Sequence, residues 1–305
     1  MKLALVFPGQ GSQSPGMLRG YAGIPGVHEA LEDAGRILGA EFTTLLDQGP
    51  AEQLDMTVNT QPAMLTGGYA AYLAWRALGG PEPEVVAGHS LGEYTALVAA
   101  GALKFADALP LVRFRAQAMQ EAVPAGQGAM AAILSLDEEK VRQACAEAGG
   151  VVQAVNFNSP EQIVIAGEKA AVQRASERCT ALGAKRAIPL PVSAPFHSTL
   201  MQPAGEKLRG YLAKVTIAAP KIRLVNNVDV KVETSPEAIR DALVRQASSP
   251  VRWVETIRAM RAQGVTHILE CGPGKALAGM VKRIDREIQT SSLNDRASIE
   301  KALAK

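Results

Sequence analysis

The chain has 305 residues, 47% of them hydrophobic, a length that suits one large domain or a large domain that carries a smaller one. Its net charge is +2, from 32 basic and 30 acidic residues, and no basic block is interleaved with aromatic residues, so nucleic acid is not an expected partner. Apolar runs stay short of the ~20 residues of a membrane span, and no signal-peptide pattern is expected at the first residues. The three cysteines are widely spaced and odd in number, which predicts neither a disulfide framework nor a zinc site. Together these features predict a cytoplasmic protein.

The first part of the chain predicts strands that alternate with helices. Residues 2–7 form an apolar strand that runs into a glycine loop, and residues 84–87 form a second strand. Helical patterns cover residues 27–38, 62–78, 91–100 and 108–122. This alternation implies a parallel sheet with helices on its faces.

The middle of the chain has a different order of elements. Strand-like and helical segments follow one another as β-α-β-β-α-β, the ferredoxin-like unit, at residues 128–134, 137–148, 151–156, 162–166, 169–182 and 186–192. Glycine and proline residues mark both borders of this unit. We therefore expect a small ferredoxin-like subdomain, residues 125–195, inserted into a large α/β-hydrolase-like domain made of residues 1–124 and 196–305.

The alternating pattern resumes after the small unit. Helices are predicted near residues 200–211, 237–245 and 251–263, with a strand at 222–226. A last strand, 266–270, meets a glycine-rich loop and a helix that starts at Lys275. A ligand is expected in a cleft between the large and the small part.

The most informative motif is G-x-S-x-G at residues 88–92, between the predicted strand 84–87 and the predicted helix 91–100. Strand, sharp turn and helix make the nucleophile elbow, with Ser90 at its apex. Free backbone N–H groups and the helix dipole there favour the negative charge that develops when a serine attacks a carbonyl. The alternative is a serine that merely caps a helix, but its place between a buried-type strand and a helix favours catalysis.

A serine nucleophile needs a general base, and histidine is the usual one. His28 starts a surface-type helix, and His89 is the sequence neighbour of Ser90, which favours a packing role. His197 lies in a proline-bounded segment where the small unit returns to the large one. The usual order of α/β-hydrolases, with the histidine near the C-terminus, nominates His267 instead. On the residues alone both His197 and His267 remain candidates.

Arg115 stands out because helical periodicity places it on the apolar side of its helix, together with Ala108, Leu111, Val112 and Met119. An arginine cannot lose its charge, so a buried one needs an anionic partner. That partner is either a carboxylate of the protein or a carboxylate of the substrate, held by two hydrogen bonds.

The glycine loop after the first strand matches only the start of a nucleotide-binding loop. Gly9 and Gly11 match the start of G-x-G-x-x-G, but Ser14 occupies the position of the third glycine, so a nucleotide site is not expected. A glycine-framed loop at the end of a strand can still present a backbone N–H to an oxyanion.

These motifs together resemble the malonyl-CoA:acyl carrier protein transacylases of type II fatty acid synthesis. The resemblance covers essentially the whole chain in order and favours His197 over His267. It rests on residues 7–13, 60–63, 88–94, 113–115, 156–160, 191–197, Gln246 with 250–253, and Glu270 with 272–275.

The resemblance implies a role for each of five residues in the reaction. Ser90 would be the acyl-accepting nucleophile and His197 its base. The backbone carbonyl of Gln246 would orient the imidazole in place of the usual aspartate. The backbone N–H groups of Gln10 and Leu91 would form the oxyanion hole.

The resemblance also implies how the substrate is held. Arg115 would bind the malonyl carboxylate, and Gln61, Asn156 and Phe196 would line the pocket. Phe196 before the histidine resembles the malonyl-selective form of this segment. Cys271 departs from the family, which more often has an aliphatic residue there, and a small apolar thiol should be tolerated.

The activity implied is ping-pong transfer of a malonyl group from malonyl-CoA, through a malonyl-serine, to holo acyl carrier protein for fatty acid elongation. It needs neither a metal nor a bound cofactor. The alternatives are a serine esterase, a non-catalytic scaffold with the same fold, and a polyketide loader that takes another extender unit.

Overall fold

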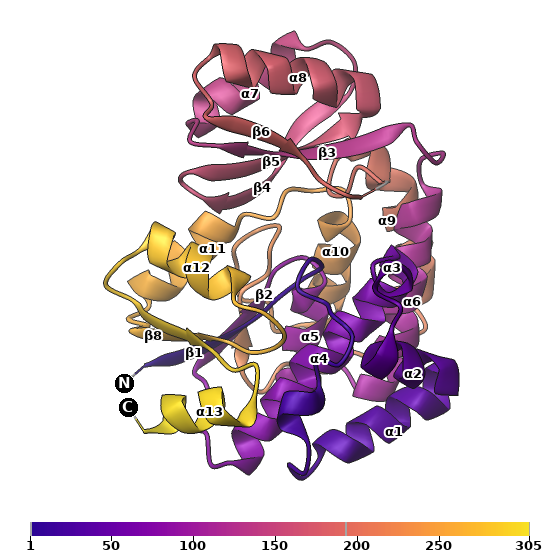
Figure 1. Cartoon of the computed structure of the whole chain (residues 1–305), viewed down its shortest axis with the longest axis vertical. Helices are drawn as coiled ribbons and strands as arrows, with labels where there is room; N and C mark the ends of the chain where they lie inside the picture. The colour runs from indigo at the N-terminus through magenta and orange to yellow at the C-terminus, as the bar shows by residue number, and fades with distance from the viewer. Residues whose placement is uncertain (1, 193, 305) are drawn as a thin grey trace.

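The computed structural model describes residues 2–192 and 194–304 and contains two sheets (Figure 1). The larger sheet has the strand order β7-β2-β1-β8-β9 and the smaller one has the order β4-β5-β3-β6. The five strands of the larger sheet are all parallel: β1 (Leu3–Phe7), β2 (Val85–Gly88), β7 (Arg223–Leu224), β8 (His267–Glu270) and β9 (Gln289–Ser292).

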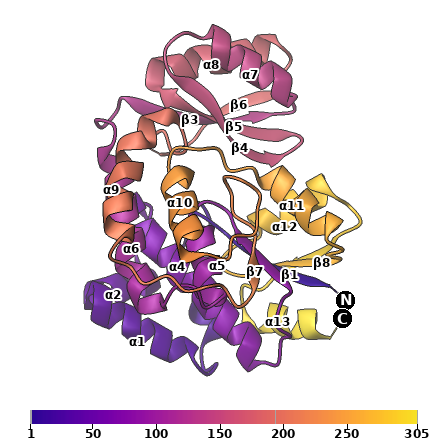
Figure 2. The same ribbon diagram turned by 180° about the vertical axis from the view of Figure 1, so that it is seen from behind.

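Both faces of the larger sheet are buried, which is the rule for parallel sheets. Successive side chains of β1 enter different hydrophobic cores: Leu5 joins the core on one face, and Val6 joins the core on the other. The first face is covered mainly by α1 (Val27–Leu38), α4 (Thr57–Ala77), α5 (Gly92–Ala99) and α6 (Phe105–Glu121). The opposite face is covered by α11 (Trp253–Ala262) and α12 (Ala276–Ile284), as Figures 1 and 2 show.

The remaining helices of this part pack in the first of these cores, except for the short 3₁₀ helix at Met201, which joins a smaller cluster with Ala118 and Met119 of α6. They are η1 (Arg19–Tyr21), α2 (Ala40–Gln48), α3 (Ala51–Leu54), η2 (Thr199–Met201), α9 (Gln202–Leu212), α10 (Pro236–Gln246) and α13 (Arg296–Leu303). Several starts follow local rules: the Ser235 side chain accepts a hydrogen bond from the Ala238 N–H, and Pro236 opens α10. The start of α5 has no such cap from a described side chain; the N–H groups of Gly92, Glu93 and Tyr94 donate instead to the carbonyls of His89, Ser90 and Leu91.

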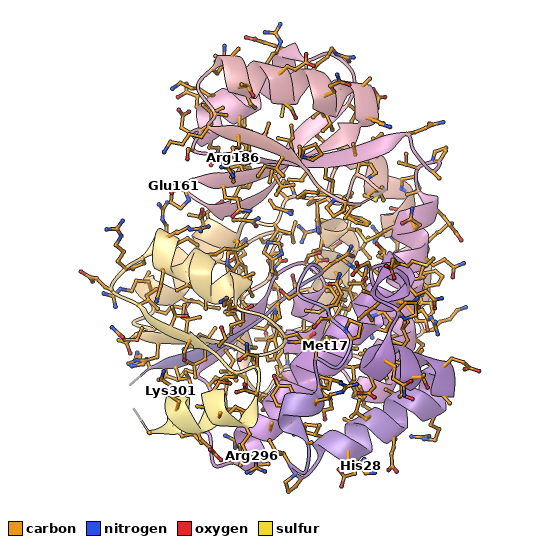
Figure 3. All side chains as sticks on the ribbon, in the orientation of Figure 1. Met17, His28, Glu161, Arg186, Arg296 and Lys301 are labelled. Atoms are coloured by element: carbon orange, nitrogen blue, oxygen red, sulfur yellow. The ribbon has the colours of Figure 1, made fainter. Side chains whose placement is uncertain are left out.

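The smaller sheet is antiparallel and lies at the upper end of the molecule in Figure 1. Its elements are β3 (Gly128–Leu134), α7 (Glu138–Glu147), β4 (Val152–Ser159), β5 (Gln162–Glu168), α8 (Lys169–Ala181) and β6 (Arg186–Pro189). Glu161 and Arg186 lie at one end of this sheet (Figure 3). Helices α7 and α8 cover one face, and the other face packs against Leu190, Val192 and Phe196.

The order of elements and of strands in this unit is the ferredoxin-like one, so the predicted fold class is confirmed. The unit is also tied to the rest of the chain by main-chain pairing. Phe157 N–H donates to the Val251 carbonyl at 3.0 Å, and Val251 N–H donates to the Val155 carbonyl at 2.8 Å. The division into residues 1–124 with 196–305 and residues 125–195 stays a prediction.

Most predicted elements occur, with differences at their ends. Helix α4 begins at Thr57 rather than at residue 62 and contains Pro62. Strand β6 ends at Pro189 rather than at residue 192: Leu190 N–H still donates to the Met130 carbonyl at 2.9 Å, but Val192 N–H turns back to the Leu190 carbonyl at 2.8 Å. Five elements were not predicted: η1, α2, α3, β9 and α13.

No helix within residues 2–192 and 194–304 combines the length and the apolar character that crossing a membrane requires.

Candidate active site

The G-x-S-x-G motif forms a sharp turn between β2 and α5. Ser90 has a φ of 53°, in the left-handed region that side-chain-bearing residues avoid outside special sites. A Cβ atom on Gly88 would come within 1.8 Å of the Gly92 carbonyl carbon, and one on Gly92 would come within 2.0 Å of the Phe7 carbonyl oxygen. Both glycines are therefore required because strand and helix backbones touch at the elbow.

Ser90 and His197 are brought together although 107 residues separate them in the chain. The distance from Ser90 Oγ to His197 Nε2 is 2.7 Å, and His197 Nδ1 lies 2.9 Å from the backbone carbonyl oxygen of Gln246. A carbonyl only accepts, so Nδ1 carries the hydrogen and the Nε2 lone pair faces the serine hydroxyl. This is the geometry of a serine with its general base, oriented by a neutral carbonyl.

His197 is 3% exposed, and its surroundings keep it neutral. Burial, together with the positive charge of Arg115, lowers its pKa to about 3, while the hydrogen bond to the Gln246 carbonyl acts in the opposite direction. A neutral imidazole is the form that can accept the serine proton.

A pH profile tests this neutral state. Because the pKa of His197 in the folded protein lies below its usual 6.5, the imidazole that is predicted to be the base stays unprotonated as pH falls through 6.5. We expect the single-turnover rate of Ser90 acylation by acetyl-CoA, whose acyl group is uncharged, to stay within about twofold between pH 8 and pH 5. The rate is followed by quenched-flow and intact mass. A tenfold fall per pH unit below 6.5 contradicts the prediction.

Arg115 is 1% exposed and lies beside the pair formed by Ser90 and His197. Its terminal nitrogens donate to Gln61 Oε1 at 2.8 Å, to Gln246 Oε1 at 2.8 Å and to Ser90 Oγ at 3.2 Å. Its Cζ lies 5.3 Å from the centre of the Tyr94 ring. Within the described residues no carboxylate reaches ion-pair distance of this guanidinium, and its Nε has no acceptor. A buried cation without a direct counter-ion is suited to binding an anion.

A cavity of about 120 Å³ joins these groups. Its lining includes eight of the nine predicted site residues: Gln10, Gln61, Ser90, Leu91, Arg115, Asn156, Phe196 and His197. The ninth, Gln246, contacts His197 and Arg115 from behind the cavity wall. The buried Oδ1 of Asn156 has no hydrogen-bond partner in the described part of the chain, so it is an unused acceptor at this wall.

Two backbone donors border the same cavity. Pairing of Phe7 with Gly88 sets the loop after β1 beside the elbow after β2, at the carboxyl ends of both strands. The N–H groups of Gln10 and Leu91 donate to no acceptor of the described residues. They are thus available to an oxygen atom that carries negative charge in this cavity, as the predicted oxyanion hole requires.

The other three histidines do not form such a pair with Ser90. His267 pairs with Leu3 at the opposite end of β1, about 13 Å along the sheet at ~3.3 Å per residue, and its Nδ1 contacts Thr266 Oγ1. His28 is exposed and lies 3.2 Å from Glu32. His89 borders the cavity, but its Nε2 is occupied by Asn158 Oδ1 at 2.7 Å.

Sequence reasoning missed Asn227, which holds the elbow in shape. Its Oδ1 accepts from the Ser90 N–H at 2.7 Å, and its Nδ2 donates to the Gly88 carbonyl at 2.6 Å. Its own N–H donates to Glu93 Oε2 at 3.0 Å. The signal in the sequence is the pair of asparagines at residues 226–227, one residue beyond the strand at residues 223–224, because polar residues at the carboxyl end of a parallel strand face the ligand side of the sheet.

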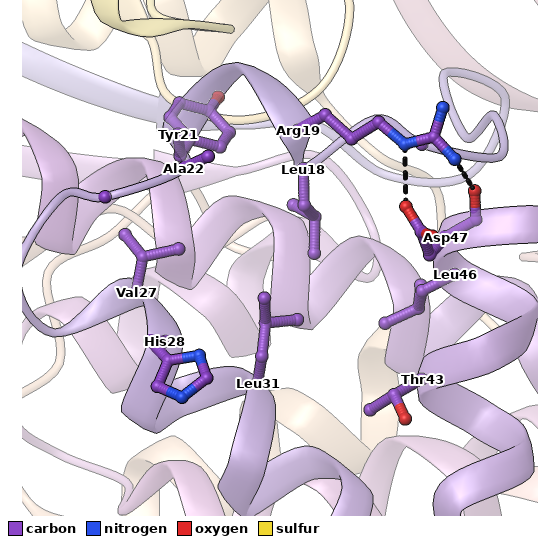
Figure 4. A pocket seen from close by; sticks show the side chains of 12 residues that line it. Leu18, Arg19, Tyr21, Ala22, Val27, His28, Leu31, Thr43, Leu46 and Asp47 are labelled. Atoms are coloured by element: carbon purple, nitrogen blue, oxygen red, sulfur yellow. Dashed lines mark hydrogen bonds and ion pairs between the residues drawn. The ribbon is translucent and has the colours of Figure 1, made fainter.

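A second hollow has a volume of about 310 Å³, and none of its lining residues also lines the cavity beside Ser90 and His197. It lies between η1, α1 and α2, and its two charged residues, Arg19 and Asp47, pair with each other at 2.7 Å (Figure 4). In the described ranges of the chain no group of three or more His, Cys, Asp or Glu residues is placed to hold a metal ion.

The family model for the acyl transferase domain matches residues 4–295. The chain is 54% identical over 305 residues to the malonyl CoA-acyl carrier protein transacylase of Escherichia coli K12, covering 99% of both chains. It is 46% identical to the protein of the same name from Bacillus subtilis, covering 99% of this chain and 96% of the relative.

Solved structures of similar proteins have the same fold over the whole chain. The acyl-carrier-protein S-malonyltransferase from Burkholderia pseudomallei superposes with a TM-score of 0.98 at 60% identity and covers 100% of both chains. A malonyl-transacylase solved in complex with a holo type II PKS acyl-carrier protein superposes with a TM-score of 0.97 at 50% identity, covering 100% of this chain and 99% of that one.

The strand-to-helix turn that carries Ser90 is the nucleophile elbow that α/β-hydrolases also have, and the match over residues 4–295 makes the class that of the acyltransferases. Within that class, the chain belongs to the acyl transferase domain family, in the branch of the malonyl CoA-acyl carrier protein transacylases.

Proposed function

We propose that the protein transfers the malonyl group of malonyl-CoA to the phosphopantetheine thiol of holo acyl carrier protein, through a malonyl-Ser90 intermediate. The observation that carries the proposal is the 2.7 Å contact between Ser90 Oγ and His197 Nε2, with the buried Arg115 at 3.2 Å from the same oxygen. The names of the relatives and the complex of one of them with an acyl-carrier protein support the choice of donor and acceptor.

The first half-reaction loads the serine. His197 Nε2 takes the hydroxyl proton as Ser90 Oγ attacks the thioester carbonyl of malonyl-CoA. The backbone N–H groups of Gln10 and Leu91 bind the resulting oxyanion. When the tetrahedral intermediate breaks down, the proton on His197 goes to the departing CoA sulfur, and malonyl-Ser90 remains.

The second half-reaction runs through the same groups in reverse. The thiol of the phosphopantetheine arm gives its proton to His197 and attacks the malonyl-Ser90 carbonyl. Ser90 leaves with that proton, so each cycle regenerates a neutral His197. The malonyl thioester formed on the carrier supplies fatty acid elongation. A cytoplasmic location stays a prediction.

Arg115 selects the acyl group in this proposal. Its guanidinium holds the distal carboxylate of the malonyl group by two hydrogen bonds, next to the Oγ that attacks the other end. Gln61 keeps the guanidinium plane in place at 2.8 Å, and Asn156 and Phe196 complete the wall of the cavity.

Intact mass spectrometry after mixing with malonyl-CoA tests the proposal. We expect a malonyl adduct on Ser90 that persists without an acceptor and disappears when holo acyl carrier protein is added. Rapid multiple-turnover release of CoA without any thiol acceptor would identify a serine esterase instead. Absence of an adduct would indicate a non-catalytic protein of this fold, and an adduct from another extender thioester in preference to malonyl-CoA would indicate a polyketide loader.

Replacement of Arg115 separates malonyl transfer from general acyl transfer. Hydrogen bonds to charged groups contribute about 1.5–3 kcal/mol, so Arg115→Ala should lower malonyl loading by roughly 10- to 100-fold or more. Acetyl-CoA lacks the distal carboxylate and leaves a desolvated cation unpaired, so its loading should be unchanged or higher. Arg115→Lys should recover little, because an ammonium cannot form the two parallel bonds. Acylation rates with both thioesters are measured.

Arg113→Ala is the matched control for this experiment. Arg113 is on the same helix but only half-buried, and its contact with the Leu38 carbonyl is long, at 3.5 Å. We expect this variant to load both acyl groups at wild-type rates. Equal losses of malonyl and acetyl loading in Arg115→Ala, or its unfolding, would make Arg115 a structural residue.

A further inference from the structure

Glu93 is a buried carboxylate that the acyl-transfer steps do not use. It lies in the first turn of α5, three residues after Ser90, and is 2% exposed. It does not border the cavity. Its Oε2 accepts from Gln246 Nε2 at 2.9 Å and from the Asn227 N–H at 3.0 Å. As far as the chain is described, no cationic side chain pairs with it directly, and both of these hydrogen bonds reach the same oxygen, Oε2.

The side-chain amide of Gln246 connects this carboxylate to Arg115. Its Oε1 accepts from Arg115 at 2.8 Å, while its Nε2 donates to Glu93 at 2.9 Å. A guanidinium only donates and a carboxylate only accepts, so the two neighbours dictate which end of the amide faces which. The opposite charges of Arg115 and Glu93 are thus one amide group apart, and each compensates the other in the buried site.

The remaining groups that face Glu93 leave this balance unchanged. Burial raises the pKa of Tyr94, its neighbour on α5, to about 12, so the phenol is neutral. Asp229, in the segment after β7, is paired with Arg245 at 2.7 Å, and this hydrogen bonding lowers its pKa. His197 is neutral. Above pH 7 the buried centre of the free protein therefore carries one positive and one negative charge.

A malonyl group on Ser90 would add a second negative charge to this centre. Two buried anions would then share a single guanidinium, and a carboxylate close to another carboxylate is disfavoured in its charged form. We propose that Glu93 is the charge-compensating group of the site: it takes up one proton from solvent when a malonyl group occupies Arg115, and it releases the proton when the malonyl group leaves. This inference rests on the proposed function, because it needs the malonyl carboxylate at Arg115.

The protonation preserves the local hydrogen bonds. A proton on Oε1 leaves Oε2 free to accept from both Gln246 and Asn227, so the amide stays oriented toward Arg115. Burial raises the pKa of Glu93 to about 7, against the opposing effects of Gln246, Asn227 and Arg115. An additional anion raises that pKa further, so uptake occurs above pH 7, where the free protein carries an ionised Glu93. Below pH 6 the carboxyl is already protonated and uptake disappears.

Proton uptake during loading tests the inference. The protein is mixed with malonyl-CoA at pH 8 in weak buffer that contains an indicator dye, and the adduct on Ser90 is counted by intact mass. We expect up to about one proton taken up per malonyl group in the wild type, and none in Glu93→Gln or when acetyl-CoA replaces malonyl-CoA. Ionisation of the released CoA thiol is common to all three and is subtracted.

Glu121→Gln is the matched control, because Glu121 is an exposed carboxylate that pairs with Lys207 at 2.8 Å. It should take up as many protons as the wild type. Equal uptake in the wild type and in Glu93→Gln, or no uptake in the wild type, overturns the inference while the malonyl adduct leaves the proposed function standing. A missing adduct would contradict the proposed function itself.

A second measurement keeps the test independent of how the variant folds. The infrared difference spectrum of the wild-type protein upon malonyl loading should show a new band from a protonated carboxyl group. The same spectrum upon acetyl loading should lack it. A malonyl spectrum without this band overturns the inference even if Glu93→Gln does not fold.

Discussion

Ser90→Ala is expected to abolish both the covalent malonyl adduct and transfer to holo acyl carrier protein. Removing the nucleophile of a serine–histidine pair lowers turnover by roughly 10⁴- to 10⁶-fold, since only binding and the oxyanion hole remain. Within the described residues, the hydroxyl of Ser90 is the one that contacts His197 Nε2, so no second hydroxyl stands ready to replace it. The measurement combines intact mass after incubation with malonyl-CoA and steady-state transfer to the carrier.

Ser135→Ala is the control for backbone strain in this experiment. Ser135 also has a left-handed backbone, with a φ of 60°, but it lies at the end of β3, outside the cavity lining. We expect normal loading and transfer in this variant. An undiminished acyl-enzyme signal in Ser90→Ala would place the nucleophile elsewhere in the chain.

His197→Ala is expected to give the second largest loss. A positioned general base contributes roughly 10²- to 10⁴-fold, and the loss should fall on acylation and on transfer alike because both half-reactions pass a proton through Nε2. The rate of loading is measured in a single turnover with malonyl-CoA, and the rate of transfer from the loaded enzyme to the carrier is measured separately.

His267→Ala is the matched comparison, since this histidine was the rival base from the order of residues in α/β-hydrolases. It lies at the amino end of β8, beside Leu3. We expect its loading rate to stay within about twofold of the wild type. A reversed result, with loading lost in His267→Ala and retained in His197→Ala, would restore the C-terminal histidine as the base.

The fold could be predicted wherever the signal was local. The bounds of α1 and β3 agree with the predicted residues 27–38 and 128–134, because apolar periodicity and flanking glycine or proline mark both elements. Strand β9, with the sequence Gln-Thr-Ser-Ser, carries no apolar alternation. It exists because its backbone pairs with β8, and a backbone pairing partner leaves no mark on the residues themselves.

The candidate site also has a part that local sequence signals predict and a part that they do not. The elbow motif, the apolar stripe that contains Arg115 and the glycine-framed loop that contains Gln10 can all be read within a few residues. The choice between His197 and His267 could not be made from spacing. It was made first by a resemblance, and the contact between Ser90 and His197 then joined residues 107 positions apart.

The sequence by itself determined the elbow, the burial of Arg115 and the order of elements, because glycine requirements and helical periodicity are properties of short segments. Only the tertiary structure decided what each polar group faces. Arg115 is hydrogen-bonded to Gln246, which lies 131 positions away in the chain, and Gln246 is hydrogen-bonded to Glu93, 153 positions away. A buried guanidinium and a buried carboxylate each need a partner of the right hydrogen-bonding type, and which residue supplies it depends on how distant segments pack around the cavity.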